Sequence, residues 1–414
     1  MEKQRERVIL HSDLNNFYAS VACRLQPELC GEYVAVCGSA EERHGIVLAK
    51  NQKAKACGVT TGEPIWRARQ KCPFLVVVPP QPKEYEKFSR AVQEVYLRYT
   101  DLVEPFGIDE CWLDVTGSRF LFGSGIEIAE KIRREVKKET GLTVSVGVSY
   151  NKVFAKLCSD LKKPDAVTCI RQEEMKQRIW PLPAAAMLGV GGATKKMLER
   201  FFIHTIGELA LQDKDTLRRR MGINGERLWY YANGLDDAPV MPFSYHSPIK
   251  SVSRGITCIR DLETRQEVLG VILELSRQVA AEMRKHGLKA AGVQLSVKDK
   301  NLGARQYQTR MGRVSDSYHM LAETAFTLFE KRYDWRLPVR AVTVGGIMLR
   351  DQTAPEQLDF FTDSQSGRQL AAEYAEGEIC QRFGENAVFP ARLLCELPIP
   401  RHWKPSILPP GFGR

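Results

Sequence analysis

The fold of this chain is decided by residues 106–114, FGIDECWLD, taken together with residues 10–18, LHSDLNNFY. Both stretches place acidic residues beside a strongly apolar run. Adjacent carboxylates such as Asp109 and Glu110 repel each other and resist burial, so a nearby cation usually has to compensate them. If folding brings Asp13 beside that pair, three carboxylates converge at one place.

A divalent metal ion is the natural partner for three such carboxylates. Hard oxygen ligands favour Mg2+ over zinc, and Mg2+ readily keeps some of its coordination positions for substrate phosphates. A pair of Mg2+ ions held in this way is the arrangement of a two-metal phosphoryl-transfer site. Taken alone, Asp109 and Glu110 also allow a second interpretation, in which they form a solvated turn.

Length and charge indicate a multidomain globular protein with a polyanionic partner. At 414 residues, with 43% hydrophobic and 27% charged residues, the chain favours two to four folded domains. Its net charge of +10 favours a polyanion. Residues 249–350 hold 18 Lys and Arg against 10 Asp and Glu, a net of +8, whereas residues 351–414 hold 6 against 9, a net of −3. This distribution predicts a basic module with a specific docking surface.

The cysteines and the apolar runs indicate in which cellular compartment the protein is expected. Eleven cysteines are scattered without a C-x-x-C pair or a Cys/His cluster at zinc spacing. An odd count without a signal peptide predicts reduced thiols in a cytoplasmic protein. No apolar run approaches the roughly 20 residues of a membrane-spanning helix, so no membrane partner is expected. We also expect a monomer.

Strands and helices alternate up to about residue 165. The expected strands cover residues 8–10, 34–37, 46–49, 75–78 and 142–148, and the expected helices cover residues 16–23, 64–72, 85–99, 126–139 and 153–161. This alternation predicts an α/β region with its carboxylates at strand ends. A helical region, a linker and an α+β module should follow, the last with a helix over 265–286 and strands near 291–297 and 339–348.

Three blocks of sequence resemble the Y-family, translesion DNA polymerases. The first is Asp13-x-Asn15-x-Phe17-Tyr18-Ala19-Ser20-Val21, the second is Ile108-Asp109-Glu110-x-x-Leu113-Asp114, and the third is residues 145–164, SVGVSYNKVFAKLCSDLKKP. They occur in the family's order and at its spacing, and the resemblance covers residues 1 to about 350. It implies template-directed DNA synthesis from deoxynucleoside triphosphates on a primed template, in translesion synthesis and DNA repair, with low fidelity.

The resemblance also implies an α+β multidomain protein shaped as a right-hand polymerase. The implied parts are an α/β palm (1–19 and 78–165), small fingers (20–77), a helical thumb with a helix-hairpin-helix turn (166–239), a linker (240–248), an α+β little finger (249–350) and a tail (351–414).

The catalytic roles follow from the same resemblance. Asp13, Asp109 and Glu110 are expected to hold two Mg2+ ions, with the Leu14 carbonyl as a further ligand. One ion lowers the pKa of the primer 3′-hydroxyl, and the other neutralises charge on the triphosphate. Asp114 is expected to be a strand-end or capping residue.

Four further residues are expected to bind the nucleotide, namely Tyr18, Phe17, Lys55 and Lys163. Tyr18 matches the family's steric gate, a ring under the sugar where a 2′-hydroxyl would sit, although it could also be a helix aromatic that fills the core. Phe17 should face the base or the core, and Tyr85 should pack near the gate. Lys163 matches the lysine that reaches the triphosphate.

The overall length and residues 106–114 favour the DinB, or polymerase IV, branch of the family, but the fingers depart from it. That branch places Thr, Tyr and Arg where this chain has Ala49, Gln52 and Lys55, and residues 49–59 resemble the UmuC branch instead. Lys55 keeps a cation for the phosphates without arginine's bidentate fork. Asn51 and Gln52 either replace the missing hydroxyls or are solvent-exposed polar side chains.

Two regions are expected to bind DNA. Gly189-Val190-Gly191 resembles a helix-hairpin-helix turn, whose glycines let backbone amides approach a phosphate, although any tight turn between helices can use two glycines. Lys195 and Lys196 follow it. The basic module offers candidates for backbone contacts as a group, namely Lys250, Arg254, Arg260, Lys298, Lys300, Arg305 and Arg310.

The tail contains residues 355–361, PEQLDFF, which resemble the Q-L-x-[LF]-F peptide that binds the sliding clamp. Leu358, Phe360 and Phe361 would be the apolar anchors, and Gln357 would add hydrogen bonds. The alternative is a tail that packs its aromatics onto its own domain.

Three other functions remain open from the sequence. The first is a UmuC-like polymerase subunit that needs accessory proteins. The second is a catalytically inactive DNA-binding homologue, and the third is a cyclase-like nucleotidyl enzyme with a related palm. Neither of the last two accounts for the three carboxylates, the glycine turn, the basic module and the clamp-like peptide together.

Overall fold

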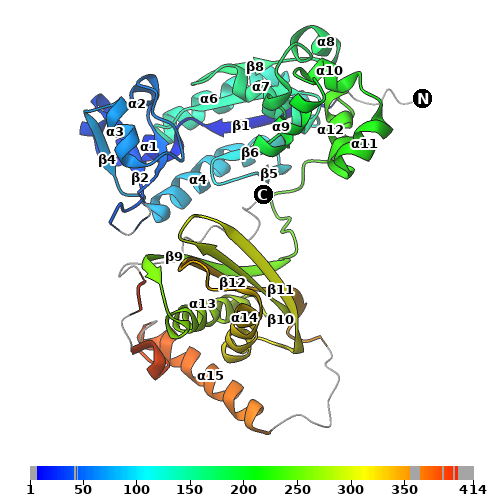
Figure 1. Ribbon diagram of the computed structural model, residues 1–414. Helices are drawn as coiled ribbons and strands as arrows, with labels where there is room; N and C mark the ends of the chain where they lie inside the picture. The colour runs from blue at the N-terminus through cyan, green and yellow to red at the C-terminus, as the bar shows by residue number, and fades with distance from the viewer. Residues whose placement is uncertain are drawn as a thin grey trace. The chain divides into compact units, whose positions relative to one another are not determined.

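The computed structural model describes residues 7–41, 43, 45–354, 364–384, 387–394 and 397–399 of the chain (Figure 1). The chain divides into two compact units. One comprises Met1–Gly38 and Ile46–His246, and the other comprises Ser39–Gly45 and Ser247–Arg414. The division after His246 falls inside the expected linker, whereas Ser39–Gly45, which the resemblance assigns to the fingers, group with the C-terminal unit.

A five-stranded sheet in the order β5-β6-β1-β7-β8 forms the centre of the N-terminal unit. Strand β1 (Ile9–Leu14) pairs antiparallel with β6 (Glu110–Asp114) and β7 (Val144–Ser149). Strand β5 (Val103–Pro105) extends one edge, and β8 (Val167–Cys169) extends the other, parallel to β7. Because β8 belongs to this sheet, the central sheet extends past residue 165, where the resemblance places the boundary between palm and thumb.

Alternate side chains of β1 serve opposite faces of the sheet, as the two-residue period of a strand requires. Leu10 and Leu14 enter a hydrophobic core that is shared with helices α4 and α6. His11 and Asp13 contact residues of α7 or of the loop after it. The helices of this region are α1 (Phe17–Leu25), α4 (Pro82–Leu97), α5 (Arg119–Phe122), α6 (Gly125–Thr140) and α7 (Lys152–Leu161).

Gly147 on β7 lets α7 pack directly against the sheet. A Cβ atom at this position would collide with the backbone oxygen of Ala155 and the backbone nitrogen of Ser159.

We expect Gly147→Ala to lower the free energy of unfolding by about 3 kcal/mol, because neither backbone atom can move without displacing the helix. Denaturant unfolding measures this change. Gly117→Ala is the control, since nothing lies within 4 Å of its Cβ position, and equal unfolding midpoints for the two variants would contradict the packing described.

A three-stranded sheet in the order β3-β2-β4 forms the predicted fingers. Asn51 caps the first helix that follows β3, because its side chain accepts a hydrogen bond from the Ala54 nitrogen at 3.0 Å. The elements are β2 (Tyr33–Cys37), β3 (Val47–Lys50), α2 (Gln52–Ala56), α3 (Ile65–Lys71) and β4 (Leu75–Val78).

The predicted thumb is helical, and its hydrophobic core, which includes Ile206, Leu217 and Leu228, is continuous with buried residues of α7 such as Phe154. Its helices are α8 (Met175–Arg178), α9 (Gly192–Arg200), α10 (Ile206–Ala210), α11 (Lys214–Met221) and α12 (Ile223–Ala232).

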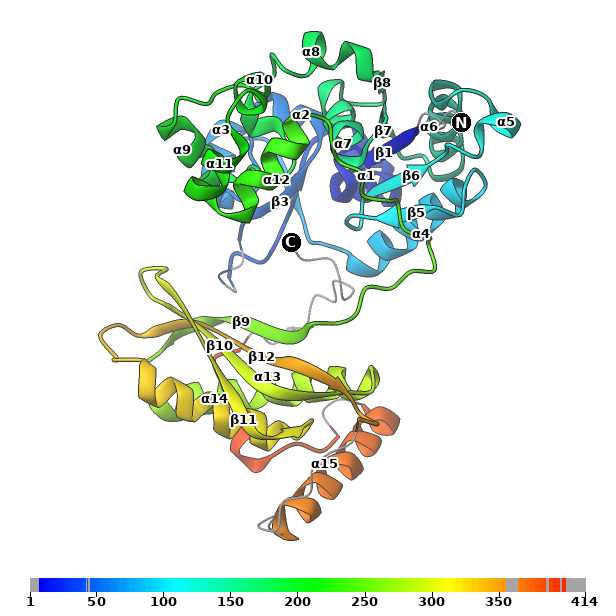
Figure 2. The ribbon, with the colours of Figure 1, turned by 90° about the vertical axis from the view of Figure 1, so that its right-hand side faces the viewer.

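The C-terminal unit is an antiparallel sheet in the order β11-β10-β12-β9, and α13 and α14 lie on one face of it (Figure 2). The expected helix and the two expected strands are present. The sequence pattern did not predict the strands β9 and β11 or the helix α14. The elements are β9 (Ser251–Leu262), α13 (Arg265–Lys285), β10 (Leu288–Asp299), β11 (Ala304–Ser315), α14 (Tyr318–Arg332) and β12 (Val339–Asp351).

Helix α15 (Ser364–Phe383) packs onto this unit, in part through a buried carboxylate. Glu373 is 2% exposed and accepts hydrogen bonds from the Ser317 hydroxyl at 2.6 Å and from the Tyr318 backbone nitrogen at 2.9 Å. The Arg284 guanidinium lies 2.9 Å from the same side chain. Part of the tail that the sequence left unassigned is therefore anchored at the start of α14.

Candidate active site

Strand pairing brings the predicted carboxylates to one end of the central strands. Asp13 on β1 is the register partner of Glu110 on β6, so the two side chains leave the sheet on the same face. Asp109 directly precedes β6, and its backbone oxygen accepts a hydrogen bond from the Leu14 nitrogen at 2.9 Å. Leu14 therefore lies beside Asp109, and the role of its carbonyl as a metal ligand stays a prediction.

Two lysines compensate these carboxylates in the structure. The Lys163 Nζ atom lies 2.7 Å from Oδ2 of Asp13 and 2.7 Å from Oδ1 of Asp160. The Lys156 Nζ atom lies 2.6 Å from Oε2 of Glu110. Across the described ranges, no three His, Cys, Asp or Glu side chains are grouped closely enough to hold a metal ion as they stand. The two ammonium groups therefore balance part of the negative charge.

Burial and neighbouring charges shift the pKa values of the three carboxylates. It raises the pKa of Asp13 to about 7, against the opposing effect of the Lys163 ammonium. Burial and the charge of Glu110 also raise the pKa of Asp109. At Glu110 burial acts in the same direction, but His11 and the Lys156 ammonium outweigh it and lower the pKa. Of the three, Glu110 is thus the carboxylate whose charged form its neighbours favour most.

The donor set fits Mg2+. Asp13, Asp109 and Glu110 supply hard carboxylate oxygens, which are the ligands that Mg2+ prefers. The position of the Lys163 ammonium shows that a cation is stabilised beside Asp13. A divalent ion would supply the charge that the buried carboxylates require.

The predicted steric gate lies beside this site. The Tyr18 ring stacks on the Tyr85 ring with a centroid distance of 4.0 Å and an interplanar angle of 13°. Tyr85 is buried, whereas Tyr18 is only partly covered. Burial and the charge of Asp109 raise the pKa of the Tyr18 hydroxyl. Phe17 is 3% exposed and belongs to the palm core, which is one of the two positions expected for it.

The polar residues of the fingers differ in the contacts that they make. Both the oxygen and the nitrogen of the Asn51 amide are engaged: Oδ1 accepts from Val34 and Ala54, and Nδ2 donates to the Glu32 carbonyl at 2.8 Å. Asn51 is therefore a capping residue in the structure, and a contact with the triphosphate stays a prediction for it. Gln52 and Lys55 are exposed on α2.

The predicted DNA-binding residues differ in their exposure to solvent and in the contacts that they already make. Gly189 has a φ of +86°, which favours glycine, and Gly191 directly precedes α9 with no atom within 4 Å of the position that a Cβ would occupy. Lys195 is exposed on α9, and Lys250 is exposed just before β9. Arg254, in contrast, is 17% exposed and lies 3.1 Å from Glu282.

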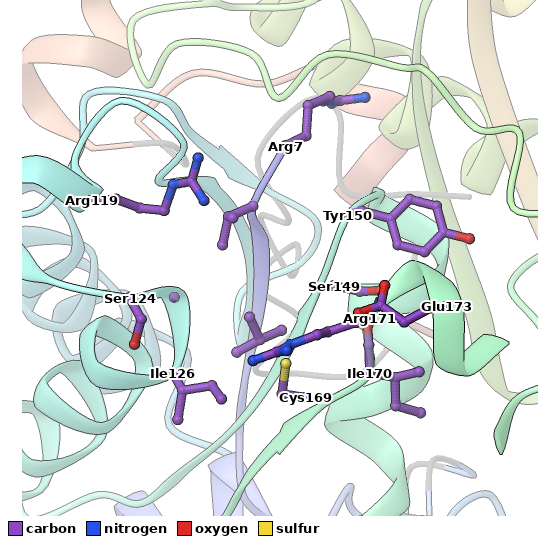
Figure 3. A pocket seen from close by; sticks show the side chains of 13 residues that line it. Arg7, Arg119, Ser124, Ile126, Ser149, Tyr150, Cys169, Ile170, Arg171 and Glu173 are labelled. Carbon is purple, nitrogen blue, oxygen red and sulfur yellow. Dashed lines mark hydrogen bonds between the residues drawn. The ribbon is translucent and has the colours of Figure 1, made fainter. Parts of the chain in front are cut away.

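A cavity of about 230 Å³ lies at the opposite end of β1 (Figure 3). Arg7, Arg119, Ser124, Cys169 and Arg171 line it, together with residues at the end of β7. Since Ser149 pairs with Ile9 and Ser145 pairs with Asp13, the cavity is about 13 Å along the strand from the carboxylates. It is therefore not part of this site.

Sequence reasoning gave no role to several residues that hold the site together. His11 and Lys156 both contact Glu110. Asn15 accepts a hydrogen bond from the Asp165 nitrogen at 2.8 Å, which fixes the loop that carries Lys163. His11 could have been found from its spacing, because a residue two positions before Asp13 on a strand shares its face.

Comparisons with known proteins identify the family. The sequence model of the impB/mucB/samB family matches residues 12–160, and that of the family's C-terminal domain matches residues 249–360. DNA polymerase IV of Acetivibrio thermocellus is 46% identical over 384 residues, which are 92% of this chain and 96% of the relative. DNA polymerase IV 1 of Bacillus subtilis is 34% identical over 385 residues, 93% of this chain and 92% of the relative.

A solved structure has the same fold. It is described as a Y-family DNA polymerase chimera, Dbh-Dpo4(243-245)-Dbh, and it matches with a TM-score of 0.73 at 24% identity over 82% of this chain and 98% of that one. No helix in the described ranges is long and apolar enough to cross a membrane.

The fold and the family matches define a right-hand polymerase with palm, fingers, thumb and little finger. The chain belongs to the Y family of DNA polymerases, and it is a DNA-directed DNA polymerase of the translesion class. Because relatives at this level of identity carry the name of an active polymerase, the inactive and cyclase-like alternatives are not favoured.

Proposed function

We propose that the chain adds deoxynucleotides to a primer 3′-hydroxyl with two Mg2+ ions held by Asp13, Asp109 and Glu110, and with the Leu14 carbonyl as a further ligand. The observation that carries this proposal is the register pairing of Asp13 with Glu110, each compensated by a lysine. When bound, the two ions activate the hydroxyl and stabilise the charge on the triphosphate. Primer extension by the isolated chain with Mg2+ and deoxynucleotides tests the proposal.

Lys163 has to change partner for this chemistry. Its ammonium group lies against Asp13 in the structure, where a metal ion would compensate the same charge. Release from Asp13 frees it to donate hydrogen bonds to the triphosphate, as the resemblance implies. Asp160, which also contacts Lys163 from one turn away, keeps the side chain near the site during the exchange.

Lys163→Met should lower kcat/KM for nucleotide incorporation by roughly 10- to 150-fold, because a hydrogen bond between charged groups contributes about 1.5–3 kcal/mol. Most of the loss should appear in the KM for the nucleotide. Single-nucleotide incorporation under steady-state conditions measures both constants. Lys162→Met is the matched control, since Lys162 is exposed and adjacent. Equal losses in the two variants would argue against a specific contact.

The nucleotide and DNA contacts complete the proposal. Tyr18, backed by Tyr85, would lie under the sugar, and Phe17 would support it from the core. Lys55 would approach the phosphates from the fingers. The glycine turn at Gly189 and Gly191, with Lys195, would bind the duplex backbone from the thumb. In the little finger Lys250 is better placed for this than Arg254, which Glu282 already engages.

The sliding clamp is the proposed protein partner. Residues 357–361, with Gln357, Leu358, Phe360 and Phe361, lie outside the described residues, so this proposal rests on the sequence pattern.

Leu358→Ala combined with Phe361→Ala should weaken clamp binding by about 100-fold or more, since apolar anchors each contribute about 2 kcal/mol or more. A pull-down and clamp-stimulated processivity measure the effect, and distributive synthesis should be unchanged. Thr362→Ala combined with Asp363→Ala is the control, and clamp binding equal to wild type by the anchor variant would refute the proposal.

The relatives named DNA polymerase IV support the DinB branch over the UmuC branch. We accordingly propose an enzyme that acts as a cytoplasmic monomer and extends primers without accessory proteins. Synthesis by the purified chain alone would support this assignment, and a strict requirement for added subunits would restore the UmuC interpretation.

A further inference from the structure

We propose that helix α3 of the fingers carries a binding surface for the unpaired template strand, with Trp66 as its stacking residue. This surface contacts DNA ahead of the primer end and takes no part in the chemistry proposed above. It rests on that function only in that the substrate is a primed template. Two exposed aromatic rings, the cations beside them and a local excess of positive charge support it.

The packing of α3 leaves most of its side chains in solvent. Ile65, Ala68 and Cys72 recur at helical spacing and pack into the core beside the three-stranded sheet. The same core includes Ala54 of α2, so α2 and α3 lie on one face of that sheet. The other positions of α3 are exposed. This outer side of the helix therefore serves no packing role within the fingers.

Two large aromatic side chains lie on this exposed part of the fingers. Trp66 on α3 is 59% exposed, and Phe74, shortly after the helix, is 78% exposed. An aromatic ring gains free energy when a second flat apolar surface covers it. Exposed apolar side chains that gather on one region of a surface are typical of a binding site. The partner is therefore expected to offer flat apolar groups.

Positive charge accompanies the two rings. The Arg67 Cζ atom lies 5.5 Å from the centroid of the Trp66 ring. Arg69 follows Trp66 at the i+3 position, which is the neighbouring position on a helix. In the part of the chain that the structure describes, neither guanidinium forms an ion pair or a hydrogen bond. Residues 50–71 hold six Lys and Arg against one Glu, a net of +5, so the partner is expected to be a polyanion.

Flat apolar groups on a polyanion describe an unpaired nucleic-acid strand. Base stacking on aromatic side chains, with cations that follow the phosphates, is the common mode of single-strand binding. A duplex offers the phosphates, but its bases are already stacked on one another. A protein partner would cover the rings but has no general need of the positive charge. In a primed template the unpaired bases are those of the template ahead of the primer end, which identifies the strand.

The length of the template overhang tests this surface. Fluorescence anisotropy of a dye-labelled primed template gives the affinity of the full chain for overhangs of one or eight thymidines. Trp66→Ala should weaken binding of the eight-nucleotide overhang by about 5- to 150-fold, the range for one stacked base, and leave the one-nucleotide overhang within about 2-fold. Trp66→Phe should stay within about 3-fold on both. Phe120→Ala is the control, because Phe120 is 96% exposed on α5, outside the fingers, and should change neither affinity.

An overhang of eight abasic sites separates stacking from charge. It keeps every phosphate and removes every base, so wild type should bind it about as weakly as Trp66→Ala binds the thymidine overhang. Arg69→Gln, in contrast, should weaken binding of both overhangs by a similar factor, because phosphate contacts do not depend on the bases. The comparison of the two overhangs uses the wild-type chain, so it remains decisive if thermal melting shows Trp66→Ala to be unfolded.

Two results would overturn the inference. One is equal affinity of wild type for the thymidine and abasic overhangs. The other is wild-type affinity of a folded Trp66→Ala variant for the eight-thymidine overhang, which would leave the rings for a protein partner. Primer extension by wild type on the one-nucleotide overhang tests the proposed function separately. Extension there without any effect of Trp66 on binding would refute this surface alone, whereas absence of extension would count against the proposed function and leave the binding results valid.

Discussion

Asp13→Asn should lower the rate of nucleotide incorporation by about 1,000-fold or more. The substitution keeps the size of the side chain but removes the charge that balances a metal ion, and such ions contribute several kcal/mol to the stability of a phosphoryl-transfer transition state. The loss should appear in kcat, because the charge matters most when the bond exchanges. Single-turnover primer extension with saturating nucleotide measures it directly.

The control for this prediction is Asp114→Asn. Asp114 lies at the other end of β6, the strand-end position expected for it, and its Oδ1 atom accepts a hydrogen bond from the Thr116 nitrogen at 2.9 Å. Its loss should leave the rate close to wild type. If Asp13→Asn also incorporates nucleotides at a rate close to wild type, and circular dichroism shows that the variant is folded, Asp13 is excluded as a metal ligand.

Tyr18→Ala should allow ribonucleotides to be incorporated while deoxynucleotide incorporation is largely retained. A 2′-hydroxyl buried against the Tyr18 ring without a hydrogen-bond partner costs about 1–3 kcal/mol, which corresponds to roughly 5- to 150-fold in selectivity. The stack on the buried Tyr85 ring prevents Tyr18 from moving aside. Primer extension with matched ribo- and deoxynucleotides gives the ratio of kcat/KM.

Tyr18→Phe is the matched control for the gate. It keeps the stacked ring and removes only the hydroxyl, so selectivity against ribonucleotides should persist. Unchanged sugar discrimination in Tyr18→Ala would rule out the gate and favour the interpretation of Tyr18 as a core aromatic.

Much of the fold of the N-terminal unit could be predicted from the hydrophobic pattern. The strand expected over residues 75–78 is β4 (Leu75–Val78), and the helix expected over 153–161 is α7 with one more residue. The strand expected over residues 8–10 is β1 (Ile9–Leu14), which runs further than expected. It continues to Leu14 because Asp13 pairs with Glu110 and is compensated by Lys163.

The C-terminal unit was less predictable for a physical reason. Strand β11 (Ala304–Ser315) is an edge strand whose side chains are mostly exposed, so it lacks the apolar alternation that marks a half-buried strand. Strand β9 (Ser251–Leu262) has a similarly mixed pattern. Helix α15 is anchored by Glu373, and a buried carboxylate cannot be recognised before its partners, Arg284 and Ser317, are known.

At the candidate site the residue types could be predicted, but their contacts could not. Asp13, Asp109 and Glu110 were recognisable from their position beside apolar runs. The partners of Glu110 depend on how β1, β6 and α7 pack, and local sequence does not encode that packing. This is why His11 and Lys156 received no role before the structure was known.

The central claim is that Asp13, Asp109 and Glu110 hold paired metal ions in place of the lysine ammonium groups. Crystals of the full chain with a primed template, an incoming nucleotide and Mn2+ would locate the ions by anomalous scattering. We predict two peaks about 3.5–4 Å apart, bonded to Asp13, Asp109 and Glu110, with Lys163 moved from Asp13 to the triphosphate. Peaks bonded to other residues, with Lys163 still paired to Asp13, would contradict the claim.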